Sequence, residues 1–229
     1  MVELVANLDA ETVRANLERV EAEIAAAVER RAPAQAGLHR GGQVEVLAAT
    51  KYIASEDLPV LAEAGVRIVG ENRAQDLEAK VAEHGELFEW DFIGALQSRR
   101  VRTIVPHVRL IHSVASDSAL REIERHRASA REGLRILIEV NLAREQEKAG
   151  IAPDRLEQLI ARAPVPVAGL MTMPPLASEP EHSRVWFRRL RELADAHGLE
   201  QLSMGTSQDY VVAVEEGATI VRIGTTLYR

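Results

Sequence analysis

The chain has 229 residues, of which 46% are hydrophobic and only 3% are aromatic, so an apolar core must be built mainly from Ala, Val, Leu and Ile. The net charge of −7 argues against a general nucleic-acid-binding protein, which normally carries a basic patch. The absence of cysteine excludes disulfides and thiolate chemistry. No apolar stretch has the length of a membrane span and no signal pattern is present, so we expect a cytoplasmic protein.

The first predicted element is an amphipathic helix over residues 9–31. Asp9 is suited to cap its start, and an apolar stripe is formed by Val13, Leu17, Val20, Ile24 and Val28. The segment APAQAGLHRGG (32–42) that follows is predicted to be a loop.

After this loop, eight apolar runs of strand length alternate with seven helical patterns. The strands are predicted at Val44–Ala49, Val66–Val69, Trp90–Ile93, Val108–Val114, Leu134–Val140, Val165–Met171, Gln201–Met204 and Thr219–Ile223. The helices are predicted near 56–64, 73–84, 96–105, 117–131, 153–162, 181–197 and 208–216. Such alternation indicates parallel βαβ units, and eight units are typical of a closed (β/α)8 TIM barrel. We therefore expect one α/β domain over 1–229, with the N-terminal helix packed where a helix after strand eight would lie.

Lys51 lies where the first predicted strand ends, and the only other lysines are Lys80 and Lys148. In a TIM barrel the active site lies at the C-terminal ends of the strands. Lysine is also the residue whose amine forms an imine with a carbonyl compound. From spacing alone, Lys51 is an imine-forming residue, a surface lysine or a salt-bridge partner of Glu71. Lys80 is expected to pair with Asp76, four residues earlier on a helix.

The segments after the seventh and eighth strands, SMGTSQD (203–209) and RIGTT (222–226), are rich in Gly, Ser and Thr. Backbone N–H groups at a helix start bind anions, and many barrels hold a phosphate after these two strands. The alternative is that Ser207 only caps a helix. Because both loops occur at the two expected positions, we predict a phosphate site.

Arg222 shares a strand face with Ile220 and Gly224, which predicts a side chain inside the barrel. A buried arginine is costly unless it is paired. It is therefore either part of a structural ion pair or a donor to a ring nitrogen of a bound cofactor. A lysine amine, a phosphate site and an inward arginine at one rim together fit pyridoxal phosphate.

Characteristic segments cover nearly the whole chain: LAATK, GENRAQDLEAK, WDFIGALQSRR, IHSV, ILIEVNLAREQEKAGI, GLMTM, LSMGTSQDY and ATIVRIGTTLY. In this combination the sequence resembles the pyridoxal phosphate homeostasis protein family, which is similar to the N-terminal barrel of alanine racemase. The resemblance implies a fold-type III barrel that binds pyridoxal 5'-phosphate (PLP) as an internal aldimine on Lys51. It also implies a role in intracellular PLP (vitamin B6) homeostasis.

The resemblance assigns specific residues to the cofactor. Ser203, Gly224 and Thr225 would contact the phosphate, and Arg222 would face the pyridine nitrogen. The complete implied set is Lys51, Asn72, Met173, Ser203, Met204, Ser207, Arg222, Gly224 and Thr225. PLP-dependent apoenzymes are candidate recipients of the cofactor, and we expect a monomer that binds neither nucleic acid nor membrane.

The chain departs from the family pattern in places. Asp91 stands where histidine is usual before FIG, ATKYIAS differs around the lysine, and SMGTS replaces a common SMGMS. The loop at 32–42 is also long for the family. These differences leave the polar detail of the pocket open.

An arginine beside the pyridine nitrogen makes the ring a weaker electron sink than a carboxylate would. A racemase also needs an acid–base group on each face of its substrate, and strand alternation is expected to turn Tyr52 away from the pocket, while Tyr210 and Tyr228 are only weak candidates. We therefore expect a carrier without catalytic residues. The alternatives are a low-activity PLP-dependent amino-acid racemase and a Schiff-base aldolase acting on a sugar phosphate.

Two other groups of residues are assigned on pattern alone. Lys148 is either a solvated loop residue or a second amine that passes the cofactor on. The histidines show no metal-ligand spacing, so no metal site is predicted.

Overall fold

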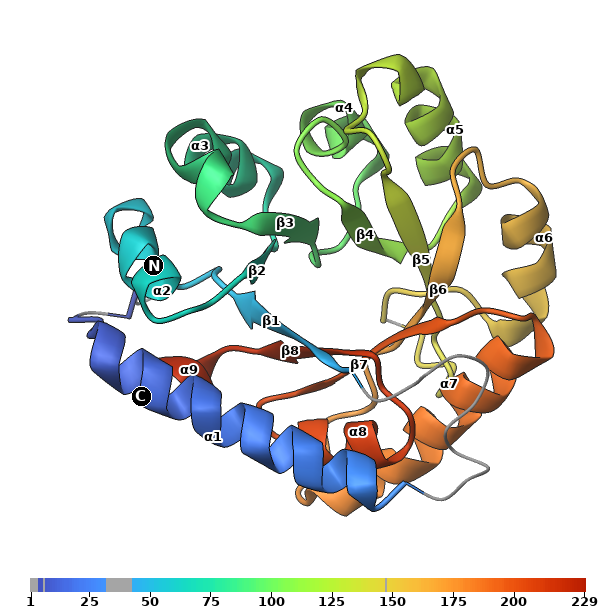
Figure 1. Cartoon of the computed structure of the whole chain (residues 1–229). Coiled ribbons are helices and arrows are strands. Elements are labelled where there is room, and N and C mark those ends of the chain that lie inside the picture. Colours follow the sequence, from blue (N-terminus) through green and yellow to red (C-terminus); the bar gives the residue numbers. More distant parts are fainter. Residues whose placement is uncertain (1–3, 6, 32–42, 147) are drawn as a thin grey trace.

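A closed barrel of eight parallel strands, hydrogen-bonded in sequence order, forms the centre of the computed structural model (Figure 1). The structure describes residues 4–5, 7–31, 43–146 and 148–229, so the predicted loop at 32–42 lies outside the described residues. The strands are β1 Glu45–Ala49, β2 Ile68–Glu71, β3 Glu89–Phe92, β4 Leu110–Val114, β5 Arg135–Glu139, β6 Val167–Met171, β7 Gln201–Thr206 and β8 Ile220–Ile223. Each overlaps a predicted strand, which confirms the predicted (β/α)8 barrel.

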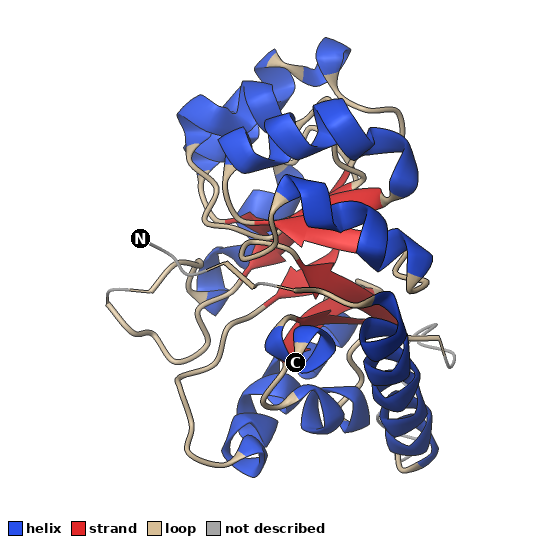
Figure 2. Cartoon of the chain, turned by 90° about the vertical axis from the view of Figure 1, so that its left-hand side faces the viewer, coloured by secondary structure: helices blue, strands red, loops and turns tan. Residues whose placement is uncertain are grey.

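Helices surround the strands on the outside of the barrel (Figure 2). They are α1 Ala10–Glu29, α2 Leu58–Glu63, α3 Ala74–His84, α4 Val101–Ile104, α5 Asp117–Arg125, α6 Leu156–Ala161, α7 Arg184–Ala196, α8 Tyr210–Glu215 and α9 Thr225–Tyr228. Several begin or end with a 3-10 turn, so the longer helices expected from the pattern are divided into two pieces. None of the helices in the described part of the chain combines the length and apolar character that a membrane span requires.

Helix α1 packs beside α8 and α9, as predicted (Figure 1). Asp9 caps the helix by accepting a 2.8 Å hydrogen bond from the backbone N–H of Thr12. Asn16 is buried and donates to the carbonyl oxygens of Leu227 and Arg229 at 3.1 and 3.0 Å. These contacts tie the start of the chain to the short helix that follows β8.

The second strand begins two residues later than expected. Gly65 has a φ of +99°, and the backbone N–H of Val66 donates to the carbonyl of Leu61, so these residues complete the end of α2. Val66 is buried by packing at the helix end rather than by a place in the sheet. An apolar run alone does not distinguish these two reasons for burial.

The inside of the barrel contains both an apolar cluster and buried polar side chains. Leu47, Leu110, Leu137, Met171 and Ile220 form a cluster inside the barrel, separate from the larger apolar layer between strands and helices. Strand alternation also places polar side chains on this inner face, between the N-terminal ends of the strands and the C-terminal rim. These buried polar residues include Asp91, His112, Ser203 and Arg222.

Candidate functional site

A cavity of about 860 Å³ lies at the C-terminal ends of the strands. Seven of the nine residues that the family resemblance implies line it: Lys51, Asn72, Met173, Ser207, Arg222, Gly224 and Thr225. The lining also includes residues that the sequence did not single out for this site: Leu4, Val5, Ala49, Ile93, Thr206, Gln208 and Arg229. The residues come from segments far apart in the chain, which the barrel brings to one rim.

Lys51 lies in a turn just beyond β1, and its side chain is exposed to the cavity. Its Nζ lies 4.5 Å from the centroid of the Tyr52 ring. The expectation that Tyr52 faces away from the pocket is wrong, because Tyr52 lines the same cavity. The reason is that β1 ends at Ala49, so the alternation of a strand does not extend to residues 51 and 52.

The turn that carries Lys51 rests on a buried polar group. Lys80 Nζ lies 2.5 Å from Glu71 Oε1 and donates to the carbonyl of Thr50 at 2.8 Å. The hydroxyl of Thr50 donates to the same carboxylate at 2.7 Å. The predicted pairing of Lys80 with Asp76 is therefore wrong, because Lys80 points from α3 toward the barrel and is only 7% exposed. Glu71 is likewise the partner of Lys80 and not of Lys51.

Asn72 follows Glu71 and brings an unused hydrogen-bond acceptor to the cavity. Its side-chain Oδ1 is buried and has no hydrogen-bond partner among the described atoms. The neighbouring backbone at Gly94 approaches so closely that a Cβ there would lie 2.0 Å from the Asn72 carbonyl oxygen. A glycine at 94 is therefore needed to keep this wall of the cavity in place.

The loops after β7 and β8 are joined by the hydroxyl of Ser207. Its Oγ accepts from the backbone N–H of Gly224 at 3.1 Å and of Thr226 at 3.5 Å. Ser207 thus bridges the two loops and does not cap α8, which was the alternative reading of its role. A Cβ on Gly224 would meet nothing nearer than the Ala49 side chain at 3.9 Å, so this side of the loop is open.

Ser203 and Met204 do not line the cavity, in contrast to the expectation for the phosphate loop. Both belong to β7 and are 0% exposed. Ser203 points into the barrel beneath Arg222, whereas Met204, one residue later, points into the apolar layer under the helices. The strand continues to Thr206, so the loop that meets the cavity begins later than predicted.

Arg222 occupies the inner face of β8, as predicted, and is only 6% exposed. It donates to Ser203 Oγ at 2.5 Å, to the Thr172 carbonyl at 3.2 Å and to the sulfur of Met173 at 2.8 Å. Within the described part of the chain these bonds go to a hydroxyl, a carbonyl and a sulfur, and no carboxylate forms an ion pair with Arg222, so the ion-pair interpretation is not supported. Burial lowers the pKa of Arg222 to about 10, although the negative charges of Glu139 and Asp209 oppose this shift.

The other two tyrosines differ in their relation to the cavity. Tyr210 donates to Glu23 on α1 and does not line the cavity. Tyr228 lines it, but its hydroxyl donates to the carbonyl of Ala49 at 3.2 Å. Burial raises the pKa of both phenols, so neither is suited to lose a proton near neutral pH.

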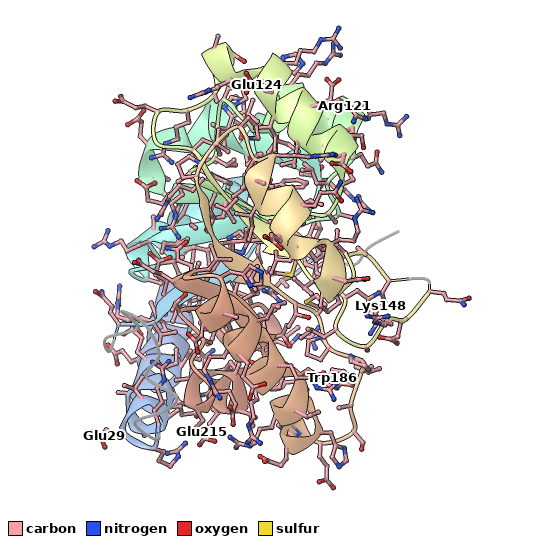
Figure 3. The ribbon with its side chains drawn as sticks, turned by 90° about the vertical axis from the view of Figure 1, so that its right-hand side faces the viewer. Glu29, Arg121, Glu124, Lys148, Trp186 and Glu215 are labelled. Carbon is pink, nitrogen blue, oxygen red and sulfur yellow. The ribbon has the colours of Figure 1, made fainter. Side chains whose placement is uncertain are left out.

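Lys148 lies on the loop after β5 (Figure 3). It forms an ion pair with Glu145 at 2.7 Å and donates to the carbonyl of Pro174 at 3.2 Å. Its side chain is 36% exposed and does not line the cavity. The structure thus places this lysine beside the loop that follows β6, one residue from Met173.

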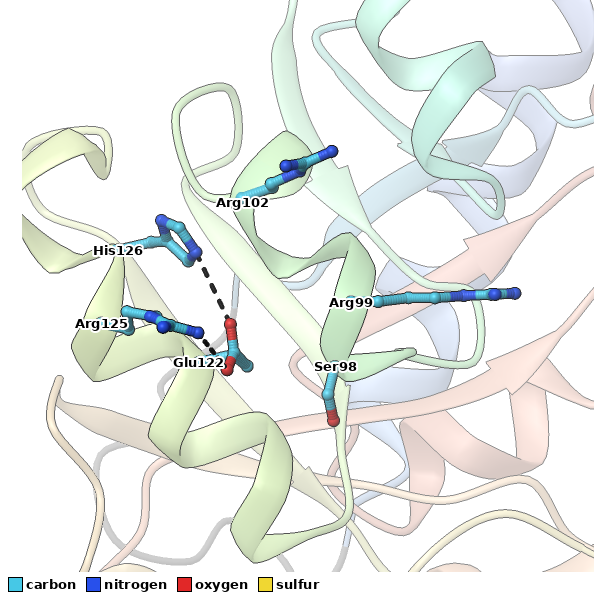
Figure 4. Close-up of a pocket in the computed structure, with 6 residues that line it drawn as sticks. All are labelled: Ser98, Arg99, Arg102, Glu122, Arg125 and His126. Atoms are coloured by element: carbon cyan, nitrogen blue, oxygen red, sulfur yellow. Dashed lines mark hydrogen bonds and ion pairs between the residues drawn. The ribbon is translucent and has the colours of Figure 1, made fainter.

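A second hollow, of about 630 Å³, lies on the outside of the barrel between α4 and α5 (Figure 4). Arg125 and His126 are directed toward Glu122, whereas Arg99 points away from it (Figure 4). The residues that line this hollow include no lysine, so it does not offer the amine chemistry of the barrel cavity. Within the described ranges no cluster of His, Cys, Asp and Glu is arranged to hold a metal ion.

Known proteins resemble this chain over almost all of its length. The family model for the N-terminal domain of alanine racemase matches residues 8–229. A protein named pyridoxal phosphate homeostasis protein, from Aquifex aeolicus (strain VF5), is 39% identical over 209 residues, which cover 85% of this chain and 92% of the relative. The protein of the same name from Pseudomonas aeruginosa is 36% identical over 224 residues, covering 95% of each chain.

A solved structure shows the same architecture. PipY of Synechococcus elongatus PCC7942, with PLP bound, has a TM-score of 0.75 and 29% sequence identity, covering 95% of this chain and 100% of PipY. The structure of PipY without PLP gives a TM-score of 0.77 over the same shares.

Proposed function

The chain belongs to the pyridoxal phosphate homeostasis protein family, and from this premise we propose that it binds PLP and takes part in intracellular PLP homeostasis. The observation that carries the proposal is the convergence of Lys51, the Ser207–Gly224 loop pair and Arg222 on one cavity. A lysine, an anion cradle and a cationic donor correspond to the aldehyde, the phosphate and the ring nitrogen of PLP. The binding of PLP by PipY supports the same ligand.

The residues of the cavity fit this cofactor chemically. The Asn72 Oδ1 acceptor is buried without a partner, which is costly unless a ligand supplies a donor. The open side of Gly224 leaves space for a phosphate beside the loop that follows β8. Arg222 has no carboxylate partner within the described ranges and stays positively charged at neutral pH, so it can donate to an unprotonated ring nitrogen.

We propose that Lys51 holds the cofactor covalently. When bound, PLP would supply two things: an aldehyde, which can form an imine with an amine by loss of water, and an electron-withdrawing ring. In the structure Lys51 Nζ rests on the Tyr52 ring, which would hold the amine at the cavity wall. PLP-dependent apoenzymes are the recipients we propose, because the cavity is open at the rim and a bound cofactor could leave again.

A slow amino-acid racemase is the second candidate, and the position of Tyr52 favours it. Racemisation needs acid–base groups on both faces of the substrate, and Tyr52 and Lys51 line one cavity. Mixing the loaded protein with L-alanine and following optical rotation tests this candidate. A decay of optical rotation with the wild type that is absent with both Lys51→Ala and Tyr52→Phe would favour the racemase. A rotation that stays constant with the wild type favours the carrier.

The main proposal is tested by absorption and chemical trapping. The purified protein mixed with PLP should absorb near roughly 420 nm, as expected for an imine of this cofactor. Borohydride should then fix the cofactor on the peptide that contains residue 51. Lys51→Ala should lose the trapped label, whereas Lys148→Ala, which alters a lysine outside the cavity, should keep it. A wild-type protein that takes up no PLP would refute the proposal, and equal labelling of Lys51→Ala would remove Lys51 from it.

A further inference from the structure

A chain of hydrogen bonds enters the barrel from the N-terminal ends of the strands. Arg109, just before β4, donates to both carboxylate oxygens of Glu45 on β1, at 2.9 and 2.6 Å. The same guanidinium donates to both oxygens of Asp91 on β3, at 2.9 and 3.1 Å. Asp91 is fully buried, so its negative charge is held in the barrel interior by this one arginine.

The chain continues upward to the PLP site. Asp91 Oδ2 lies 3.1 Å from His112 Nε2, and His112 Nδ1 lies 2.8 Å from Ser203 Oγ. Arg222 Nη1 completes the path by donating to Ser203 Oγ at 2.5 Å. The three intermediate residues are 0% exposed, so water does not compete for these bonds.

The chemistry of the groups fixes the direction of every bond. The Asp91 carboxylate only accepts, so His112 Nε2 carries the proton and donates to it, and Nδ1 of the neutral ring is left as an acceptor. The Ser203 hydroxyl therefore donates to His112 Nδ1, while its oxygen accepts from Arg222, which can only donate. Without a carboxylate at 91 the other tautomer becomes available. Nδ1–H would then donate to the serine oxygen beside Arg222, and the hydroxyl hydrogen, having lost its acceptor, would turn and shift the geometry of the Arg222 bond.

We propose that Asp91 is a positioning residue for Arg222: by selecting the tautomer of His112, it makes Ser203 the acceptor that holds the arginine in its orientation toward the cavity. This inference rests on the proposed function, in which Arg222 donates to the pyridine nitrogen. Because the ring electronics depend on that donor, a change at Asp91, on the far side of the interior, alters the bound chromophore.

The test compares the spectra of PLP-loaded Asp91→Asn and wild type. The variant keeps the size of the side chain but removes its charge, and it should shift the absorption band and raise the Kd for PLP roughly tenfold, as expected when a hydrogen bond to a charged group is misaligned. In the unloaded protein, histidine ¹⁵N spectra should show that the Nε2–H tautomer of His112 is lost.

Glu216→Gln is the matched control. Glu216 is also 0% exposed and bound by arginines, accepting from Arg184, Arg188 and Arg191 at 3.1, 3.2 and 2.6 Å, but it lies among the outer helices. The Glu216→Gln variant should have lower stability than the wild type but an unchanged absorption spectrum. If Asp91→Asn behaves like this control, with lower stability and an unchanged spectrum and Kd, Asp91 is only structural and the inference is overturned.

Two further variants keep the test decisive. Ser203→Ala removes the last link and leaves Asp91 paired with Arg109, so it should reproduce the spectral shift even if Asp91→Asn fails to fold; an unchanged spectrum overturns the inference. In an Arg222→Lys background, Asp91→Asn should add no further shift, and an additive shift also overturns it. A wild type without any chromophore would instead refute the proposed function.

Discussion

Replacement of Lys80 by methionine should cost far more stability than the loss of an ordinary surface charge. The Lys80 and Glu71 side chains are 8% and 0% exposed and lie 2.5 Å apart. Methionine fills the space of the lysine stem but leaves the Glu71 carboxylate buried without its cation. Breaking a buried pair in this way costs about 3–5 kcal/mol. For a chain of this size that loss lowers the melting temperature by roughly 6–20 °C.

Urea and thermal unfolding of the unloaded protein measure this loss directly. Lys148→Met is the matched control, since its partner Glu145 is 2.7 Å away but both side chains are more than a third exposed. Solvent screening should keep that change within about 0.5 kcal/mol. The double variant Lys80→Met with Glu71→Gln should recover at least half of the loss, because no charge is left buried. Our reasoning fails if both lysine variants lose the same stability, or if the double variant is worse than Lys80→Met alone.

Two further predictions concern the barrel rim and interior. Gly205 has a φ of +90°, and a Cβ there would lie 2.6 Å from Ala213 Cβ, so Gly205→Ala should cost about 2 kcal/mol or more in urea unfolding. Gly133→Ala, with a φ of +76° and open space, should cost only about 1 kcal/mol; equal losses would show that the contact is harmless. Burial lowers the pKa of His112 below 6.5 in the folded state, despite the opposing bond to Asp91, so the unfolded chain binds the proton first as pH falls. The contribution of His112 to stability is therefore fully present above pH 6.5, and below that pH it is lost by up to about 1.4 kcal/mol per pH unit. His112→Gln should flatten the dependence of the unfolding free energy on pH between pH 7.5 and 5.5. An unchanged slope would show that other groups cause it.

The barrel was predictable because its signal is repeated and local. Each strand forms an apolar run that the next helical pattern separates from its neighbour, and the order of elements leaves few topologies. The inward position of Arg222 followed from two-residue alternation within β8. In both cases the information lies within a few consecutive residues.

The failures arise where alternation stops or where partners are distant. Tyr52 was misplaced because strand alternation was extended to it, although β1 ends at Ala49 and the residues beyond form a turn. Ser203 lies in β7, which continues through Gly205 to Thr206, and its predicted contact with the phosphate stays a prediction. Lys80 was assigned to its helical neighbour although a buried carboxylate from another element was nearer. The path through Asp91 joins positions whose proximity only the closed barrel creates.

The hydrogen bond from Asn16 to the carbonyl of Leu227 joins residues 211 positions apart in the sequence. During synthesis α1 leaves the ribosome long before the segment around α9 that it packs against has been made, so its apolar face stays exposed until then. The ring likewise closes only when β8 reaches β1. Contacts between positions so far apart carry a large loop-closure entropy, so the last step of folding, closure of the ring, should be slow. The cavity at the strand ends is lined by residues from both ends of the chain, so it exists only in molecules in which the ring has closed.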